Sequence, residues 1–246
     1  MVEMKPTKQT DQNEICIPRD LMMQAAMLRL GNVDKEIHAG YEMLKKYHKT
    51  VTVFGSARLS ETSKYYQAAH SVSAKLAARE YAVISGGGHG IMGAANAGAK
   101  QAGGHSIGFN IQLPHEQTLN DHTTDSLSFS HFSPRKIVMT LFANAYIYFP
   151  GGFGTLDELA EILTLIQTHK TTPAPVILFG SEFWGPFDDF IKNQLRDELQ
   201  LITPGDENLY VITDDEDEVV KIVESNQTYC SHKGTTSVVP EGVNKQ

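Results

Sequence analysis

The chain contains the stretch Phe149-Pro150-Gly151-Gly152-Phe153-Gly154-Thr155-Leu156-Asp157-Glu158, in which three of four consecutive positions are glycine. An apolar run, Ala145–Phe149, precedes it as a buried strand would, and apolar residues follow at helical spacing: Leu159, Ile162, Leu163 and Ile166. The stretch is therefore predicted to be a strand, a glycine turn and a helix. Such glycines let the backbone approach a ligand, and the helix N-terminus favours an anion such as a phosphate.

The same stretch has a purely structural interpretation. Thr155 and Glu158 have the spacing of a capping box, in which the two side chains close the N-terminus of a helix. Both interpretations remain open on this stretch alone, and other parts of the chain favour the first.

Composition limits the class of protein. The chain has 246 residues, of which 41% are hydrophobic and 20% charged, so it is long enough for one large α/β domain. Met1–Glu14 is polar and no apolar run is as long as a membrane span, so we expect a cytoplasmic protein without a membrane partner. A formal charge of −8 argues against binding to nucleic acid and favours a small-molecule ligand.

Cysteine and histidine patterns predict neither a disulfide framework nor a metal site. Cys16 and Cys230 lie near opposite ends of the chain and are interpreted as free thiols. The ten histidines show no ligand spacing, so we expect surface or packing roles and no metal.

The chain is predicted to form a single domain over residues 15–228, between a disordered tail at 1–14 and a flexible tail at 229–246. Residues 15–49 are predicted to be a pair of helices that begins at Pro18 and breaks at Gly31-Asn32. This helical extension either packs on its own domain or forms a subunit contact.

From Thr50 onward, strands and helices alternate. Strands are predicted at 51–55, 81–85, 105–110, 145–149, 175–179 and 209–213. Helices are predicted near 63–79, 91–102 and 184–199, and others begin at Pro134, at Thr155 and after Thr213. Thr213 is the expected N-cap of the last helix. The link Pro114–His131 is predicted to be a long polar connection. This order indicates an α/β fold, a Rossmann-like doubly wound parallel sheet that helices cover on both faces.

Ligands of such sheets bind beyond the carboxyl ends of the strands, at the point where the strand order reverses. Four loops are expected there: Gly55–Arg58, Gly86–Gly93, the segment before Arg135, and the Pro150–Gly154 turn. The four loops are predicted to face a common cleft.

The second of these loops contains Gly88-x-Gly90-x-x-Gly93 after a strand and before a helix, which is the spacing of a dinucleotide fingerprint. A dinucleotide site needs an acidic residue at the end of the next strand to bind the ribose hydroxyls, and Asn110 stands at that position. The pattern is therefore only weak support for an NAD site. The glycines indicate either a close approach to a nucleotide or only a tight turn.

Ser133-Pro134-Arg135-Lys136 is predicted to start a helix, with Ser133 as N-cap and Pro134 as the first helical residue. Two cations in the first turn oppose the helix dipole, at about 0.3–1 kcal/mol each, which indicates a nearby anion. Alternatively, both side chains extend into solvent.

Three motifs together resemble the Lonely Guy (LOG) family, cytokinin riboside 5′-monophosphate phosphoribohydrolases that were often labelled lysine decarboxylases. They are Ser85-Gly86-Gly87-Gly88-His89-Gly90-Ile91-Met92-Gly93, Arg135-Lys136, and Pro150–Glu158. The resemblance spans about Val51–Val223. It implies a Rossmann-like enzyme that hydrolyses the N-glycosidic bond of a nucleoside 5′-monophosphate without a metal or organic cofactor, as a homodimer or higher homo-oligomer.

The resemblance also implies the site residues. Arg135 and Glu158 fall on the catalytic pair, and a carboxylate suits the positive charge that develops on the sugar. The expected phosphate- and nucleotide-binding residues are Ser56, Gly87, Gly88, Met92, Lys136, Gly151, Gly152, Gly154 and Thr155. Glu161 is either a second acid of the pocket or a solvated residue.

Ser133-Pro134 and Ala143-Asn144-Ala145 depart from the family pattern, so the preferred base, adenine or an N6-prenylated adenine, stays open. A carrier that binds a nucleotide or the molybdenum cofactor without hydrolysis is the main alternative, because relatives share the glycine turn. Lysine decarboxylase is the weakest candidate, since neither Lys136 nor Lys170 has the setting of a pyridoxal phosphate Schiff base.

Overall fold

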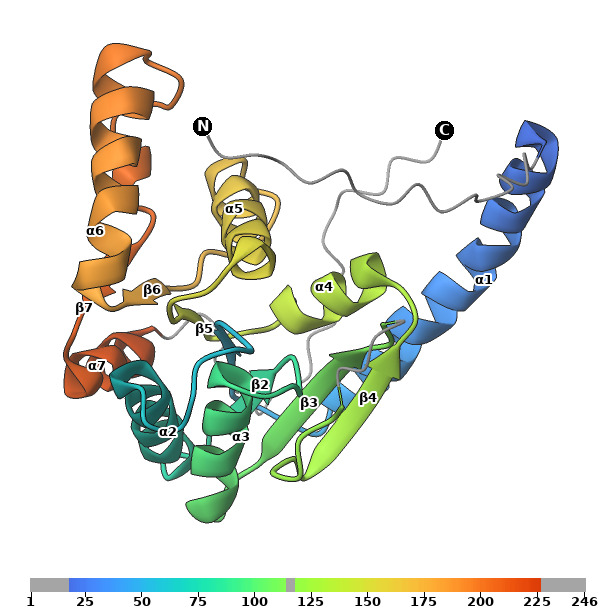
Figure 1. Cartoon of the computed structure of the whole chain (residues 1–246), viewed down its shortest axis with the longest axis horizontal. Helices are drawn as coiled ribbons and strands as arrows, with labels where there is room; N and C mark the ends of the chain where they lie inside the picture. The colour runs from blue at the N-terminus through green and yellow to red at the C-terminus, as the bar shows by residue number, and fades with distance from the viewer. Residues whose placement is uncertain (1–17, 114–117, 227–246) are drawn as a thin grey trace, which may run out of the picture.

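The computed structural model describes residues 18–113 and 118–226, and these residues form one seven-stranded parallel sheet (Figure 1). The strands are β1 (Thr50–Phe54), β2 (Ala82–Ser85), β3 (Ser106–Ile111), β4 (Asp125–Phe129), β5 (Ala145–Tyr148), β6 (Val176–Phe179) and β7 (Val211–Thr213). Their order in the sheet is β4-β3-β2-β1-β5-β6-β7. The predicted α/β, Rossmann-like fold class is confirmed.

Helices cover both faces of the sheet (Figure 1). They are α1 (Arg19–Leu44), α2 (Lys64–Ala77), α3 (Ile91–Gln101), α4 (Phe132–Thr140), α5 (Phe153–Gln167), α6 (Ser181–Asp189) and α7 (Glu216–Ser225), with a π-helical continuation of α6 at Phe190–Glu198 and a 3-10 turn at Asp206–Asn208. No helix within the described part of the chain combines the length and apolar content that a membrane span requires.

Alternate strand residues enter two separate cores, because successive side chains of a strand point to opposite faces. Val51 and Val53 of β1 pack in one core with α2, α3 and α7, whereas Phe54 packs in the other core with α1, α4, α5 and α6. The central strands are buried on both faces, which explains why they occur in the sequence as short apolar runs.

The strand order reverses between β1 and β5. These neighbours are paired in parallel from Val51–Ala145 to Phe54–Tyr148, and their connections leave in opposite directions along the sheet. Beyond their carboxyl ends, the Ser56 N–H donates to the Pro150 carbonyl at 3.0 Å and joins the two following loops. This junction is the point where a ligand site is expected in an open α/β sheet.

Strand β4 was not predicted. It lies within the link Pro114–His131, pairs with β3 at the edge of the sheet, and alternates between partly exposed and exposed positions until Phe129. Its sequence, Asp-Ser-Leu-Ser-Phe, contains no apolar run because only one face of this edge strand is buried.

The N-terminal extension is a single helix, so the prediction of a helical pair over 15–49 is wrong. Helix α1 continues through Gly31-Asn32, where a glycine costs about 1 kcal/mol but does not end a helix by itself. Only its C-terminal part packs on the protein, through Gly40 and Leu44, and the remainder extends away from the sheet (Figure 1). The predicted tails, 1–14 and 229–246, lie outside the described residues.

Two helices begin at residues other than those predicted. The N-cap of α4 is His131, so Ser133 and Pro134 lie inside the first turn. The N-cap of α7 is Asp215, whose side chain accepts from the N–H groups of Asp217 and Glu218, while Thr213 ends β7. In both cases the predicted cap lies two residues before or after the observed N-cap.

Candidate active site

A pocket of about 560 Å³ lies beyond the carboxyl ends of β1 and β5. It is lined by the loop Gly55–Arg58, by Gly86 and Met92, by one face of α4, and by the N-terminal part of α5 from Gly152 to Glu158. The four predicted loops therefore contribute to a common cleft. The structure brings together seven of the predicted site residues, namely Ser56, Met92, Arg135, Gly152, Gly154, Thr155 and Glu158.

Helix α5 begins earlier than the capping-box interpretation requires. The N-cap of α5 is Gly152, which has no side chain to form a cap hydrogen bond. Thr155 is the third residue of the helix, whereas a capping box would need Thr155 at the N-cap position. Glu158 then lies in the second turn, too far along the helix to reach back to an N-cap N–H. The capping box is not formed, and Glu158 is available for another role.

The glycines of the turn have different structural reasons. A Cβ on Gly151 would overlap the Thr155 side chain, so Gly151 allows Thr155 to pack against the turn. A Cβ on Gly152 or Gly154 would meet no atom within 4 Å, because both face open space at the start of α5. The exposed backbone N–H groups of a helix N-terminus attract anions, so this open side suits a phosphate.

Glu158 is buried although it can carry a charge. Glu158 is only 6% exposed, and its Oε2 atom has no hydrogen-bond partner among the described residues. Burial raises the pKa of Glu158 to about 7, while Lys136 and Arg135 oppose the shift. A carboxylic acid with a pKa near 7 and a free oxygen in a pocket is typical of a catalytic acid or base.

Arg135 faces the same pocket from α4. Its Nε donates to the Phe109 carbonyl at 2.7 Å, and its guanidinium lies over Gly86, where any Cβ would overlap it. Burial lowers the pKa of Arg135, an effect that Glu158 partly offsets, and an arginine still keeps its charge at any physiological pH. The bond to Phe109 and the contact with Gly86 hold the cation beside the pocket.

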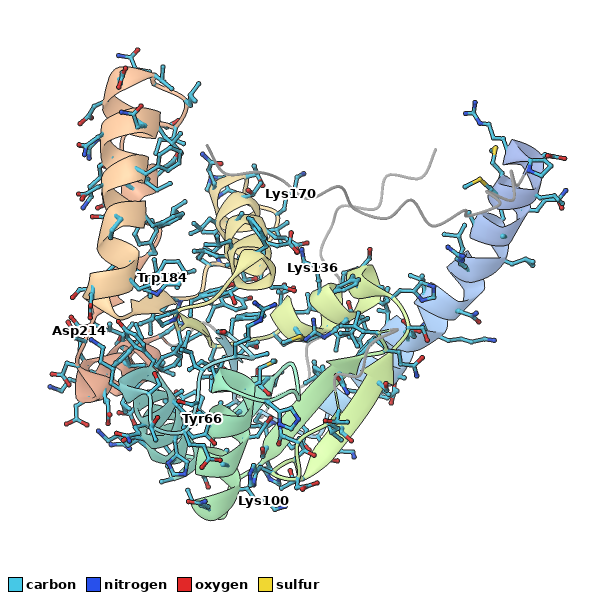
Figure 2. All side chains as sticks on the ribbon, in the orientation of Figure 1. Tyr66, Lys100, Lys136, Lys170, Trp184 and Asp214 are labelled. Atoms are coloured by element: carbon cyan, nitrogen blue, oxygen red, sulfur yellow. The ribbon has the colours of Figure 1, made fainter. Side chains whose placement is uncertain are left out.

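Lys136 does not line the pocket. It lies between α4 and α5 (Figure 2), where its Nζ pairs with Asp157 at 2.9 Å and with Glu161 at 2.7 Å. Burial lowers the pKa of Lys136, but hydrogen bonds with Glu161 and Asp157 raise it above the ordinary value overall. Lys136 therefore joins the two helices as a cation, and Glu161 is its ion-pair partner rather than an acid of the pocket.

Gly87 and Gly88 are not among the residues that line the pocket. Gly87 has a φ of +70° and packs against Gly108 and Leu119, and the Gly88 carbonyl accepts from the Asn120 side chain at 2.9 Å. In the described structure these glycines form a turn that Asn120 holds against the sheet. Gly151, which contacts Thr155, also lies outside the lining.

Several lining residues were not predicted from the sequence. Phe132 and Met139 line the pocket on the same face of α4 as Arg135, with the spacing of a helix face. The assumed start of α4 at Pro134 placed Phe132 outside the helix and concealed this pattern. Ile111, Leu113 and Asp157 line the pocket outside the four predicted loops and were also missed, whereas Arg58, Gly86 and Phe153 belong to those loops but were not named as site residues.

Known proteins identify the family of the chain. The family model described as "Possible lysine decarboxylase" matches residues 92–223, more than half of the chain. The chain belongs to this family. The resemblance to the LOG family is confirmed as well, because curated relatives are named cytokinin riboside 5′-monophosphate phosphoribohydrolases.

Two of these relatives show the extent of the similarity. The protein of Mycobacterium marinum is 36% identical over 141 residues, which cover 56% of this chain and 73% of that protein. A protein of Arabidopsis thaliana is 25% identical over 186 residues, covering 75% of this chain and 81% of the relative.

Solved structures show the same fold. The molybdenum cofactor carrier protein of Chlamydomonas reinhardtii superposes with a TM-score of 0.54 at 23% identity, covering 72% of this chain and 96% of the carrier. Because the identity is low, this likeness concerns the arrangement of the chain and not the chemistry of the pocket.

Proposed function

We propose that the protein hydrolyses the N-glycosidic bond of a purine nucleoside 5′-monophosphate, AMP or an N6-modified AMP of the cytokinin type, to free base and ribose 5-phosphate. The observation that carries the proposal is the buried Glu158, with an unpaired carboxyl oxygen and a pKa raised to about 7, beside Arg135 in a pocket at a helix N-terminus. Membership of the family and the names of the curated relatives support it.

The geometry suggests how the chain's residues act. The phosphate of the substrate binds at the open N-terminus of α5, near Gly152, Gly154 and Thr155. As the bond between C1′ of the ribose and the base breaks, its electron pair leaves with the base and positive charge develops at C1′. Glu158 as a carboxylate stabilises that charge, and water supplies the hydroxyl for C1′ and the proton for the base.

Arg135 complements this role. Like Lys136, whose effect is larger, it lowers the pKa of the buried Glu158 by its positive charge and so increases the fraction of carboxylate at neutral pH. Because the pKa of Glu158 is about 7, we expect activity to rise with pH up to about 7 and then to level off.

The residues present do not fit lysine decarboxylation. Pyridoxal phosphate needs a lysine whose amine forms a Schiff base, but Lys136 is paired with two carboxylates and no lysine is among the described residues that line the pocket. Lys170 lies beyond the far end of α5, away from the turn (Figure 2). The description of the family model therefore does not extend to the chemistry of this site.

A carrier that binds without hydrolysis remains the second class to test, because the fold is shared with molybdenum cofactor carriers. Binding alone requires no carboxylate with a raised pKa in the pocket. The presence of Glu158 together with Arg135 favours hydrolysis.

The test is incubation of the purified protein with AMP and, separately, with N6-isopentenyladenosine 5′-monophosphate, followed by chromatography for free base and ribose 5-phosphate. We expect release by the wild type, loss of at least about a hundredfold in Glu158→Gln, and weaker binding and turnover in Arg135→Ala. Glu224→Gln, which removes an exposed carboxylate of α7, is the matched control. Nucleotide that binds but is never cleaved would establish the carrier instead.

We also propose, from the family resemblance, that the enzyme works in the cytoplasm as a homodimer or a higher homo-oligomer. Large exposed apolar residues on α1, such as Met27, Leu28 and Leu30, support self-association. Light scattering measures the mass in solution, and a monomer at micromolar concentration would contradict the oligomer.

A further inference from the structure

Three cationic side chains lie in or beside the pocket, and two of them already have partners. Arg135 donates its Nε hydrogen to the Phe109 carbonyl and interacts electrostatically with Glu158. Lys136 is held between Asp157 and Glu161, outside the lining. Lys136 could reach a phosphate only by giving up both ion pairs, and the bond from Arg135 Nε to Phe109 fixes the direction in which that guanidinium points.

Arg58 is the third cation, and it is free. Its side chain lines the pocket and is exposed, and it forms no ion pair or hydrogen bond with any residue that the structure describes. The backbone of Arg58 is nevertheless fixed, because its N–H donates to the Ser56 hydroxyl at 3.1 Å. The loop is held in place while the guanidinium remains available for a ligand.

The position of this loop brings Arg58 close to the start of α5. Ser56, two residues earlier, donates its N–H to the Pro150 carbonyl at 3.0 Å, immediately before the glycine turn. The residues Gly55–Arg58 and Gly152–Thr155 line the same pocket. A phosphate at the N-terminus of α5 would therefore lie within the region that a long arginine side chain covers.

The pocket is lined by cations as well as by carboxylates. Arg58 and Arg135 line it together with Asp157 and Glu158, and Lys136 pairs with Asp157, so the arginine charges offset the carboxylates and allow a phosphate dianion to bind. An arginine fork forms paired, charge-assisted hydrogen bonds with phosphate oxygens, which are about twice as strong as neutral ones.

We propose that Arg58 binds the 5′-phosphate and makes the pocket select a nucleotide over the corresponding nucleoside. This inference rests on the proposed function for the identity of the ligand. It assigns to Arg58 the phosphate contact that the sequence motif suggested for Lys136.

The experiment compares AMP with adenosine in Arg58→Ala, Arg58→Lys and Arg29→Ala. Arg29 is the matched control, because it is an exposed arginine of α1 outside the lining of the pocket. Affinities for AMP, adenosine and inorganic phosphate are measured by titration calorimetry in a Glu158→Gln background, where turnover is blocked. KM and kcat for AMP are measured in the otherwise wild-type protein.

In Arg58→Ala we expect the Kd and the KM for AMP to rise roughly tenfold to a hundredfold, with kcat changed by less than about twofold and adenosine affinity unchanged. Arg58→Lys should recover part of the loss, since it keeps the charge but not the fork. Arg29→Ala should match the wild type.

Equal losses for AMP and adenosine, equal effects in Arg58→Ala and Arg29→Ala, or a wild type that does not distinguish AMP from adenosine would each overturn the assignment. The calorimetry separates this inference from the proposed reaction. If AMP binds through Arg58 but the wild type never cleaves it, the reaction is wrong and the phosphate contact stands.

Discussion

Glu158 meets two opposing requirements, because burial favours its protonated form and the proposed reaction needs its charged form. Its pKa rises from an ordinary value of 4.5 to about 7 in the folded protein. The folded state therefore binds the proton more tightly than the unfolded state does. Below about pH 4.5 both states are protonated; between about pH 4.5 and 7 the unfolded state has lost the proton that the folded state keeps, so the stability of the fold decreases, and above about pH 7 the decrease levels off.

This linkage predicts that Glu158→Gln is more stable than the wild type at pH 8, by on the order of 2–3 kcal/mol, and similar to it near pH 4.5. The amide keeps the shape of the side chain but carries no charge to bury. Urea unfolding at the two pH values measures the difference, with Glu224→Gln as the exposed control. A lower stability of Glu158→Gln at pH 8 would mean that the carboxylate makes a stabilising contact.

At the residue scale, the sequence motifs predicted Arg135 and Glu158, which the structure places in one pocket with Ser56, Met92 and Thr155. The prediction for Lys136 followed from its position next to Arg135. Neighbouring residues of a helix point about 100° apart, so Arg135 faces the pocket while Lys136 faces α5. Sequence proximity could not show this difference before the start of α4 was known.

At the scale of the elements, α1 holds the start of α4. Glu36 of α1 accepts a hydrogen bond from the Ser130 N–H at 2.9 Å and lies 3.4 Å from Nδ1 of His131, the N-cap residue. The cap itself has no side-chain hydrogen bond, and Glu36 supplies a negative charge at this helix N-terminus. One turn later on α1, Gly40 lies directly against Val138 of α4.

We therefore predict that Glu36→Ala loosens the first turn of α4, which carries Phe132 and Arg135 into the pocket, and lowers kcat/KM roughly three- to tenfold. Glu36→Gln should retain more activity, because its amide oxygen still accepts from Ser130. Glu42→Ala is the control, since Glu42 pairs only with Lys45 of the same segment among the described residues. Steady-state kinetics of the three variants decide the point, and equal activities would contradict a positioning role for Glu36.

The elements that sequence patterns predicted are those with strong periodicity. Buried strands such as β1 and β5 have continuous apolar runs, and α5 has a clear apolar face. Strand β4 lacked such a run, and α1 contains a glycine whose effect depends on the helix around it. In both cases the pairing with another part of the chain determines the structure, and local sequence does not contain that information.

At the scale of the whole molecule, alternation of strands and helices predicted a parallel sheet but not its strand order. The order depends on pairings between segments that are distant in the sequence. Strand β1, for example, pairs with β2 on one side and with β5 on the other, although β3 and β4 lie between β2 and β5 in the chain. The expectation that the site lies at the carboxyl ends of the strands required only the general rule for such sheets.

The reversal between β1 and β5 divides the protein into two complementary fragments. Residues 141–144 join α4 to β5, so Arg135 belongs to one side of this short connection and Glu158 to the other. A polypeptide interrupted there would keep a parallel half-sheet in each fragment, but neither fragment would contain both members of the proposed pair. Catalysis would then reappear only when the β1–β5 ladder had rejoined the halves, which makes the enzyme a natural reporter of its own reassembly.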